Sequence, residues 1–215
     1  MAKEKLDRDT INFRPAQPED AKIASRLLFE TFPQKATFVF GLGDAERAKR
    51  ILRTLFEKPG HRLSYTETEM VVHQGRVIGL FTAFPGREIG RRNGRLYLLI
   101  MQQYKVRGKI AVFQRGWPLV FIKETSRKEY FLSNLVVKGR YRSLGVGDQM
   151  LSRIEEKARD MTLDRLSLMV AIENKRARQF YDRHGFKTTA IHLESNKRVP
   201  YLGAGHQRLI KDLEG

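Results

Sequence analysis

Cysteine is absent from this chain of 215 residues, which excludes disulfide bonds, thiolate metal sites and a cysteine nucleophile. Histidine is then the only strong ligand left for transition metals, and with five of them we expect no metal site. Long apolar runs are also missing: the longest, LYLLIM from Leu96 and WPLVFI from Trp117, have about six residues, against roughly 20 for a membrane-spanning helix. The first residues, MAKEKLDRDT, lack the apolar core of a secretory signal. These absences predict a cytoplasmic protein without a transmembrane segment.

Acidic residues are few beside the basic ones, 24 against 41, which gives a formal net charge of +17. A field of this sign attracts polyanions such as nucleic acid, anionic lipid or phosphorylated cofactors. Between Gly86 and Arg127, ten Lys and Arg residues accompany only two acidic residues, a net +8. Glycine breaks and aromatic residues there indicate two or three short basic amphipathic helices. We therefore expect one domain, residues 1–215, with a basic helical insertion at residues 86–127.

Apolar periodicity alternates between strand and helix spacing, without a repeat of fixed length. We expect strands at 11–16, 130–137 and 166–171, a hairpin at 63–84 that turns at Gln74-Gly75, helices after Pro18, after Asp44, at 145–161 and at 175–184, and further strands after residue 186. This order is typical of a mixed sheet covered by helices. The predicted fold class is therefore α/β, with a cofactor site where a strand leads into a helix.

The segment RSLGVG, residues 142–147, leads from a strand directly into a helix. Gly145 and Gly147 allow a ligand to approach the backbone, and the free N–H groups of a helix start attract an anion. Such glycines also occur where only a tight turn is needed, so the pattern alone leaves both interpretations open. The dinucleotide fingerprint fails because Met150 replaces its third glycine, and no P-loop sequence occurs.

Two motifs about thirty residues apart are more specific. VVKGRYRSLGVG (136–147) resembles the pyrophosphate-binding motif of the GCN5-related N-acetyltransferases, the GNAT superfamily, and NKRARQFYDRHGF (174–186) resembles their second motif, N-x-x-A-x-x-x-Y-x-x-x-G-F. The detailed match covers about sixty residues, 130–188. The resemblance implies a mixed, mainly antiparallel sheet with splayed middle strands, covered by helices on both faces, that binds acetyl-CoA in the gap. The basic insertion lies outside this shared core.

The resemblance also implies a role for each matching residue. The strand would pair with the pantetheine arm, the turn would wrap the pyrophosphate, and the second motif would hold the cofactor from the next helix. The residues that would bind acetyl-CoA are Leu135, Val136, Val137, Arg142, Ser143, Leu144, Gly145, Val146, Gly147, Asp148, Asn174, Ala177 and Tyr181. Tyr181 would also be catalytic, because a phenol is protonated at pH 7 and can donate to the departing thiolate. As an isolated pattern, Ala177, Phe180 and Tyr181 would indicate a core stripe.

Some positions depart from the family pattern. Many members have a carboxylate just before the position of Leu135, where this chain has Asn134, so the general base is not identified. The candidates for this base are Glu30, Glu67, Glu69, His73 and Glu129. We expect each of them to be a solvated surface group and not the base. Asp148 stands where a hydroxyl often touches phosphate, and its charge would repel the pyrophosphate unless the side chain points away.

The expected activity is transfer of an acetyl group from acetyl-CoA to a primary amine, by direct attack in a ternary complex. The sequence does not identify the acceptor, which is a small molecule or a protein. The insertion could form a lid over its pocket, or it could be a solvated face or a dimer contact, which leaves a homodimer open. The alternative is a binding module of the same fold that docks through the insertion on RNA, the ribosome or an anionic surface.

Overall fold

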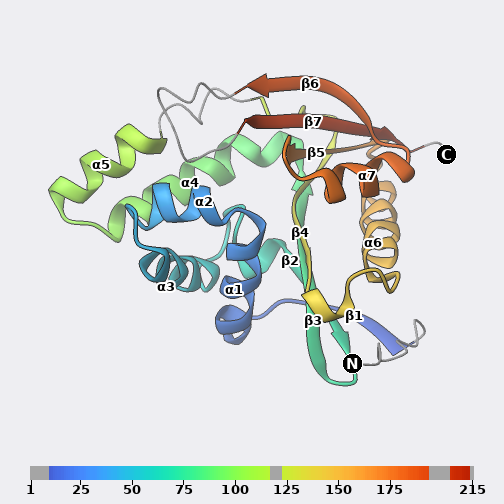
Figure 1. Cartoon of the computed structure of the whole chain (residues 1–215), viewed down its shortest axis with the longest axis horizontal. Coiled ribbons are helices and arrows are strands. Elements are labelled where there is room, and N and C mark those ends of the chain that lie inside the picture. Colours follow the sequence, from blue (N-terminus) through green and yellow to red (C-terminus); the bar gives the residue numbers. More distant parts are fainter. Residues whose placement is uncertain (1–9, 117–122, 194–203, 214–215) are drawn as a thin grey trace.

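The computed structural model describes residues 10–116, 123–193 and 204–213 (Figure 1). Residues 1–9 and the apolar run that starts at Trp117 lie outside the described residues. The strands are β1 (Ile11–Pro15), β2 (Thr68–His73), β3 (Arg76–Pro85), β4 (Tyr130–Val137), β5 (Arg165–Ala171), β6 (Lys187–Leu193) and β7 (Gly205–Asp212). The helices are α1 (Ala21–Thr31), α2 (Pro33–Lys35), α3 (Ala45–Phe56), α4 (Ile89–Gln102), α5 (Val106–Gly116), α6 (Val146–Asp160) and α7 (Lys175–Arg183).

Local sequence rules explain several of these boundaries. Asp44 caps α3 by accepting a hydrogen bond from the Arg47 N–H at 3.0 Å. The β2–β3 hairpin turns at Gln74 and Gly75, whose φ angles of 47° and 73° suit a tight two-residue turn. The predicted front half of strand, two helices and hairpin is therefore confirmed. A π-helical turn at Ala36–Phe40, which continues α2, is an addition that apolar periodicity does not indicate.

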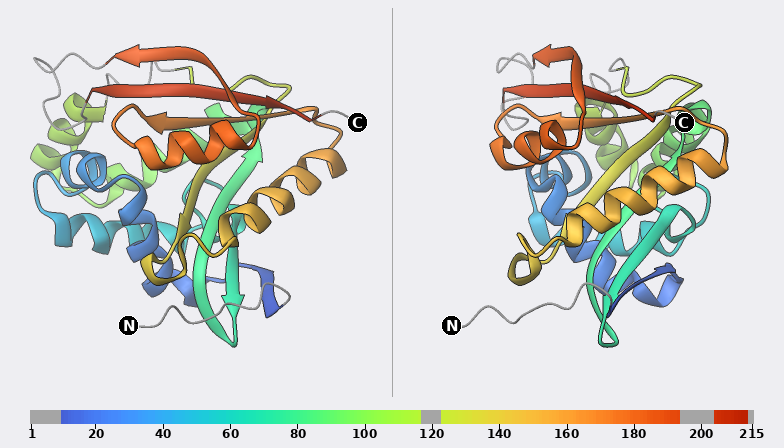
Figure 2. Two further views of the ribbon diagram at one scale, coloured as in Figure 1. Left: turned by 45° about the vertical axis from the view of Figure 1, so that its right-hand side comes forward. Right: turned by 90° about the vertical axis from the view of Figure 1, so that its right-hand side faces the viewer.

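All seven strands form one sheet in the order β1-β2-β3-β4-β5-β7-β6. β4 and β5 are parallel, and the other neighbouring pairs are antiparallel. Tyr130–Leu132 pairs with Leu166–Leu168, and the described strands have no register with each other beyond these residues. The β1–β4 half and the β5–β7 half of the sheet therefore run in different directions (Figures 1 and 2). The predicted mixed sheet with splayed middle strands is confirmed.

Helices cover both faces of the sheet, as expected (Figure 2). α1, α3 and α4 pack around a core on one face that includes Leu52, Phe56 and Leu80. α6 and α7 pack around a second core on the other face, which includes Met150 and Leu168. The segment after β3 contains two of the expected basic helices, α4 and α5, which lie beside α3 and the π-helical turn (Figure 1). The two faces thus enclose the point where β4 and β5 separate.

Candidate functional site

A gap opens between β4 and β5 where their short pairing ends. Beyond Leu132, β4 continues to Val137, and among the described strands it pairs there only with β3. Because a strand carries hydrogen-bonding groups on both edges, the second edge at residues 133–137 can pair with another extended, amide-bearing chain. Leu135, Val136 and Val137 lie in this stretch, and their side chains are buried or half-buried. The described strands therefore leave this edge of β4 available for an extended chain that carries amide groups.

The turn between β4 and α6 presents a row of backbone donors. Ser143 and Gly145 take the left-handed conformation, with φ of 63° and 85°, and the glycine is the N-cap of α6. The first hydrogen bond of this helix runs from the Gln149 N–H to the Gly145 carbonyl at 3.3 Å. No described residue accepts a hydrogen bond from the N–H groups at positions 146–148. With the positive end of the helix dipole behind them, these groups can bind an anion.

Side chains from neighbouring elements hold the turn in place. Arg142 donates from Nε to the Val137 carbonyl at 2.8 Å, and its Nη2 lies 3.2 Å from the Glu30 carboxylate. Arg176 on α7 donates to the Ser143 hydroxyl at 3.1 Å. The structure thus brings the end of β4, the turn and α7 together, as the two motifs predict. Arg142 is engaged with protein groups, and Glu30, a candidate base, is its half-exposed partner.

The remaining residues of the turn pack against protein groups. Leu144 and Val146 join the core under α6, where Val146 is 1% exposed. A Cβ added at Gly147 would lie 3.2 Å from the Phe180 ring, so the close approach of α7 also requires this glycine. Asp148 turns toward α7, with its Oδ1 3.1 Å from Nε2 of the histidine at the end of that helix. Its carboxylate is therefore paired within the protein.

The second motif forms α7 and its cap. Asn174 is the N-cap residue, and its Oδ1 accepts a hydrogen bond from the Ala177 N–H at 3.1 Å. Tyr181 follows Ala177 by four residues on the same helix face and is 8% exposed, with its ring 5.3 Å from those of Phe180 and Phe186. Burial raises the pKa of Tyr181, so its hydroxyl is protonated at neutral pH. No described residue forms a hydrogen bond with this hydroxyl.

The expectation of solvated surface groups is wrong for four of the candidate bases. Glu69, His73 and Glu129 are 6%, 6% and 3% exposed. The side chain of Glu67 is 11% exposed. Glu69 pairs with two cations of α6, and His73 Nδ1 lies 2.8 Å from the Thr10 hydroxyl. Burial alone would raise the pKa of Glu129, but hydrogen bonds led by that from Arg208 lower it to about 2. Each of these groups is already bound to a partner within the fold.

Asn134 belongs to a buried hydrogen-bond network. Its Nδ2 donates to the Thr82 hydroxyl at 2.7 Å, and its Oδ1 accepts from the Thr31 hydroxyl at 3.0 Å. β4 bulges here, because the register with β3 passes from Thr82–Asn134 to Ala83–Leu132 and leaves Ser133 unmatched. An amide side chain does not titrate, so Asn134 holds α1, β3 and β4 together and does not accept the proton of an amine.

A second group of residues beside the bulge escapes sequence analysis. Arg62 donates from Nε and Nη2 to the Ser133 hydroxyl, at 3.3 and 3.2 Å, and pairs with Glu124 through Nη1. Burial is the main cause that lowers the pKa of His206 to about 4, and the positive charge of Lys35 lowers it further. The ring is therefore neutral at pH 7. The Glu124 charge acts on the same ring. No motif indicates this group, because its members come from five separate segments of the chain.

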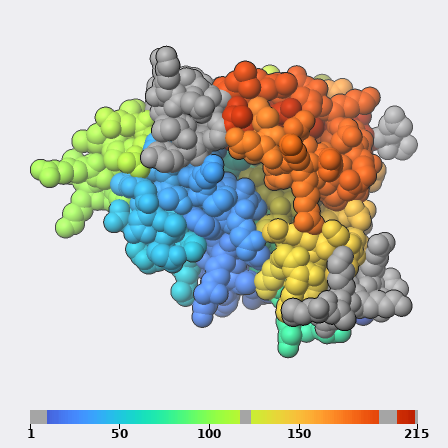
Figure 3. All heavy atoms as spheres, in the orientation of Figure 1, coloured from blue at the N-terminus to red at the C-terminus, as the bar shows by residue number. Residues whose placement is uncertain are grey.

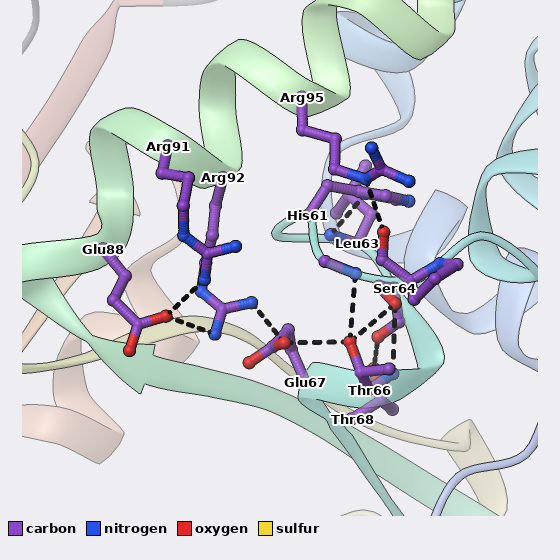
Figure 4. Close-up of polar contacts among 12 residues, drawn as sticks. His61, Leu63, Ser64, Thr66, Glu67, Thr68, Glu88, Arg91, Arg92 and Arg95 are labelled. Carbon is purple, nitrogen blue, oxygen red and sulfur yellow. Dashed lines mark hydrogen bonds and ion pairs between the residues drawn. The ribbon is translucent and has the colours of Figure 1, made fainter.

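The insertion is anchored to the sheet by a buried arginine. Arg92 of α4 pairs with Glu67, the fifth candidate base, and with Glu88 (Figure 4). Its guanidinium also lies 5.0 Å from the centre of the Phe84 ring. Arg91, one residue earlier, also pairs with Glu88 but from an exposed position. α4 is therefore fixed to the start of β2 and the end of β3.

Two other kinds of site are not found in the described parts of the chain. No three His, Asp or Glu side chains there gather as metal ligands. None of the helices described there is both long and apolar enough to cross a bilayer. The described region does offer an edge of β4 without a strand partner, a turn whose N–H groups at 146–148 have no described acceptor, and the buried phenol of Tyr181.

Known proteins resemble the chain in sequence over its central part. A family model described as the Acetyltransferase (GNAT) family matches residues 35–186, which include both motifs and the insertion. The protein described as "Uncharacterized N-acetyltransferase YycN" of Bacillus subtilis (strain 168) is 31% identical over 77 residues, or 35% of this chain and 49% of that protein. The chain thus spans about half the length of this curated relative.

Solved structures share the fold over nearly the whole chain. One described as "The crystal structure of acetyltransferase" has a TM-score of 0.70 at 21% identity, over 94% of this chain and 100% of that one. An N-acetyltransferase from Staphylococcus aureus Mu50 has 0.71 at 18% identity, over 93% and 99%. A GNAT family acetyltransferase from Elizabethkingia anophelis with acetyl-CoA bound has 0.52 at 15%, over 96% and 100%. At these identities the similarity establishes the fold.

Proposed function

Because the chain belongs to the GNAT family of acetyltransferases, we propose that it transfers the acetyl group of acetyl-CoA to a primary amine, by direct attack in a ternary complex. The observation that carries the proposal is the separation of β4 from β5 after Leu132, directly ahead of a turn with free N–H groups. Pantetheine is extended and carries amides, and pyrophosphate is an anion. The gap and the turn offer the matching groups.

When bound, acetyl-CoA supplies an activated acetyl group as a thioester. In our proposal the free edge of β4 at Leu135, Val136 and Val137 pairs with the pantetheine amides, and the N–H groups at positions 146–148 hold the pyrophosphate. A backbone N–H beside the bulge polarises the thioester carbonyl, a fixed donor of the kind that lowers the barrier to acyl transfer. Asn174 and Ala177 border the cofactor from α7.

Tyr181 is the proposed general acid. Its buried hydroxyl stays neutral at pH 7, which leaves a proton available for the sulfur as the carbon–sulfur bond breaks. No base is assigned, because Asn134 cannot titrate and the candidate carboxylates are paired. The acceptor amine must therefore enter in its neutral form, and we expect the rate to rise with pH until the free amine predominates.

The alternative of a docking module gains no support from the insertion. Arg92 is buried in ion pairs, and Arg95 and Arg115 donate to the backbone carbonyls of Pro59 and Phe38 at 2.8 and 3.0 Å. Part of the basic excess thus stabilises the fold. The acceptor, the homodimer and the cytoplasmic location stay predictions.

Thermal unfolding with ligands tests the proposal. At a concentration 100 times its Kd, acetyl-CoA stabilises the protein by about 2.7 kcal/mol, which for a chain of this size raises Tm by about 5–11 °C. ATP, which lacks pantetheine, is the control and should shift Tm less. Release of free thiol in the presence of a panel of primary amines then measures transfer. No shift with millimolar acetyl-CoA would overturn the proposal.

A further inference from the structure

Asp148 brings a negative charge into the turn that the proposed function assigns to the pyrophosphate. The residue lies in the first turn of α6, and its own N–H is one of the donors without a described acceptor. Like charges repel at such short range, so an uncompensated carboxylate here would weaken the binding that the N–H groups provide. A histidine lies beside this carboxylate.

His184, at the end of α7, faces oxygen acceptors with both ring nitrogens. Its Nε2 lies 3.1 Å from the Asp148 carboxylate, and its Nδ1 lies 2.8 Å from the Phe180 carbonyl. A neutral imidazole has one N–H and can donate to only one of these oxygens, whereas the protonated ring donates to both. The Phe180 ring, 4.4 Å away between centroids, keeps the imidazole in this orientation. The geometry is therefore complete only when His184 carries a proton.

Two cations near the pair are bound elsewhere. The side chain of Lys211 on β7 lies near Gly185, because its Cε is 3.9 Å from a Cβ added there. Its ammonium group pairs with Glu155 on α6. Arg176 on α7 donates to Ser143. Among the described residues, His184 is the ion-pair partner that the structure gives to Asp148.

We propose that His184 is a positioning residue whose proton compensates Asp148, so that affinity for acetyl-CoA falls as the pH rises and the ring loses that proton. The inference rests on the proposed function. With His184 protonated, the carboxylate is neutralised and held against α7. With His184 neutral, one nitrogen loses its hydrogen bond and the charge of Asp148 acts on the pyrophosphate. Histidine is the side chain that titrates between pH 5 and 8.

Calorimetric titration of the full chain with acetyl-CoA at pH 5.5 and pH 8.5 tests the inference. Asp148→Asn should bind about three- to tenfold more tightly than the unmodified protein at pH 8.5 and about equally at pH 5.5. The ratio at each pH cancels the titration of the ligand's own phosphates. Asp160→Asn is the matched control, because it removes the same charge from the far end of α6, roughly 18 Å away, and should follow the unmodified protein at both pH values.

Two further variants separate the charge of His184 from a structural role. His184→Gln should bind about three- to tenfold more weakly than the unmodified protein at pH 5.5. The double variant Asp148→Asn with His184→Gln should recover the affinity of Asp148→Asn, because the charge to be compensated is gone. Recovery would not follow if His184 only supported the fold of α7.

The outcomes separate a failure of the proposed function from a failure of the inference about His184. Absence of acetyl-CoA binding at both pH values would overturn the proposed function and the inference with it. Binding in which Asp148→Asn differs from the unmodified protein by the same factor at both pH values would overturn the inference alone. So would a double variant that remains as weak as His184→Gln.

Discussion

Replacement of Arg92 by alanine removes the cation that joins α4 to the sheet. Its side chain is 8% exposed, and those of its partners Glu67 and Glu88 are 11% and 27% exposed. Loss of one partner of a buried ion pair costs about 3–5 kcal/mol, because the other charge stays buried. Glu67 retains a hydrogen bond from Thr66 at 2.9 Å and Glu88 retains Arg91 at 2.8 Å, so we expect the lower end, about 3 kcal/mol.

Arg91→Ala is the matched control on the same helix. Arg91 also pairs with Glu88, but its side chain is 63% exposed, and exposed pairs contribute at most about 1 kcal/mol. A change of 1 kcal/mol shifts Tm by about 2–4 °C at this size. Arg92→Ala should therefore lower Tm by about 6–12 °C and Arg91→Ala by less than about 4 °C, measured by circular dichroism and checked by urea unfolding.

The result that would refute this reasoning is an Arg92→Ala variant no less stable than Arg91→Ala. The double variant Arg92→Met with Glu67→Met provides a second test, because it removes both charges and fills the site with apolar atoms. It should be more stable than Arg92→Ala, since the buried Glu67 carboxylate is gone and Glu88 keeps Arg91 as its partner. A cumulative loss in the double variant would mean that packing, and not charge, dominates at this site.

Three further changes test the site and the sheet. Tyr181→Phe should lower kcat by about 10²- to 10⁴-fold in a thiol-release assay while acetyl-CoA binding persists, because the ring contacts remain; an unchanged kcat would mean that another group or water protonates the sulfur. Gly147→Ala places a methyl group 3.2 Å from a ring of α7 and should weaken acetyl-CoA binding several-fold, whereas Gly139→Ala, with nothing within 4 Å, should not; equal affinities in calorimetry would contradict this. The pKa of about 2 at Glu129 lies below its usual value, so the stabilisation from its ionised form is present above about pH 4.5 and lost as the pH falls toward 2. Glu129→Gln should reduce the dependence of the urea unfolding midpoint on pH below about pH 4.5. An unaltered slope would show that the Glu129 carboxylate does not cause the loss of stability in acid.

Features governed by neighbouring residues could be predicted from the sequence. The helix start at Asp44 and the Gln74-Gly75 turn depend on contacts or dihedral angles within a few residues. The two motifs are also local, and the fold that they imply brings the turn against α7, where Arg176 reaches Ser143.

Features that depend on distant partners could not be predicted. Glu129 is buried because Arg208, 79 residues later, reaches it from β7. Arg62 meets Ser133 across 71 residues, and the bulge that exposes this hydroxyl to it has no sequence signal. A charged residue is normally solvated, so its burial becomes predictable only once its counterion is placed.

The departures of this site from the family pattern favour a working cofactor site over an idle one. Two residues of the turn have partners nearby: Ser143, which takes φ of 63° without being glycine, accepts a hydrogen bond from Arg176, and Asp148, one of the departures, faces His184. A left-handed conformation costs a non-glycine residue of order 1–3 kcal/mol and persists only where its surroundings enforce it. A turn released from binding phosphate would have no need to keep this strain or to neutralise a carboxylate beside its free N–H groups. Both contacts come from α7 and its C-cap residue, and they agree with our proposal that this turn binds an anion.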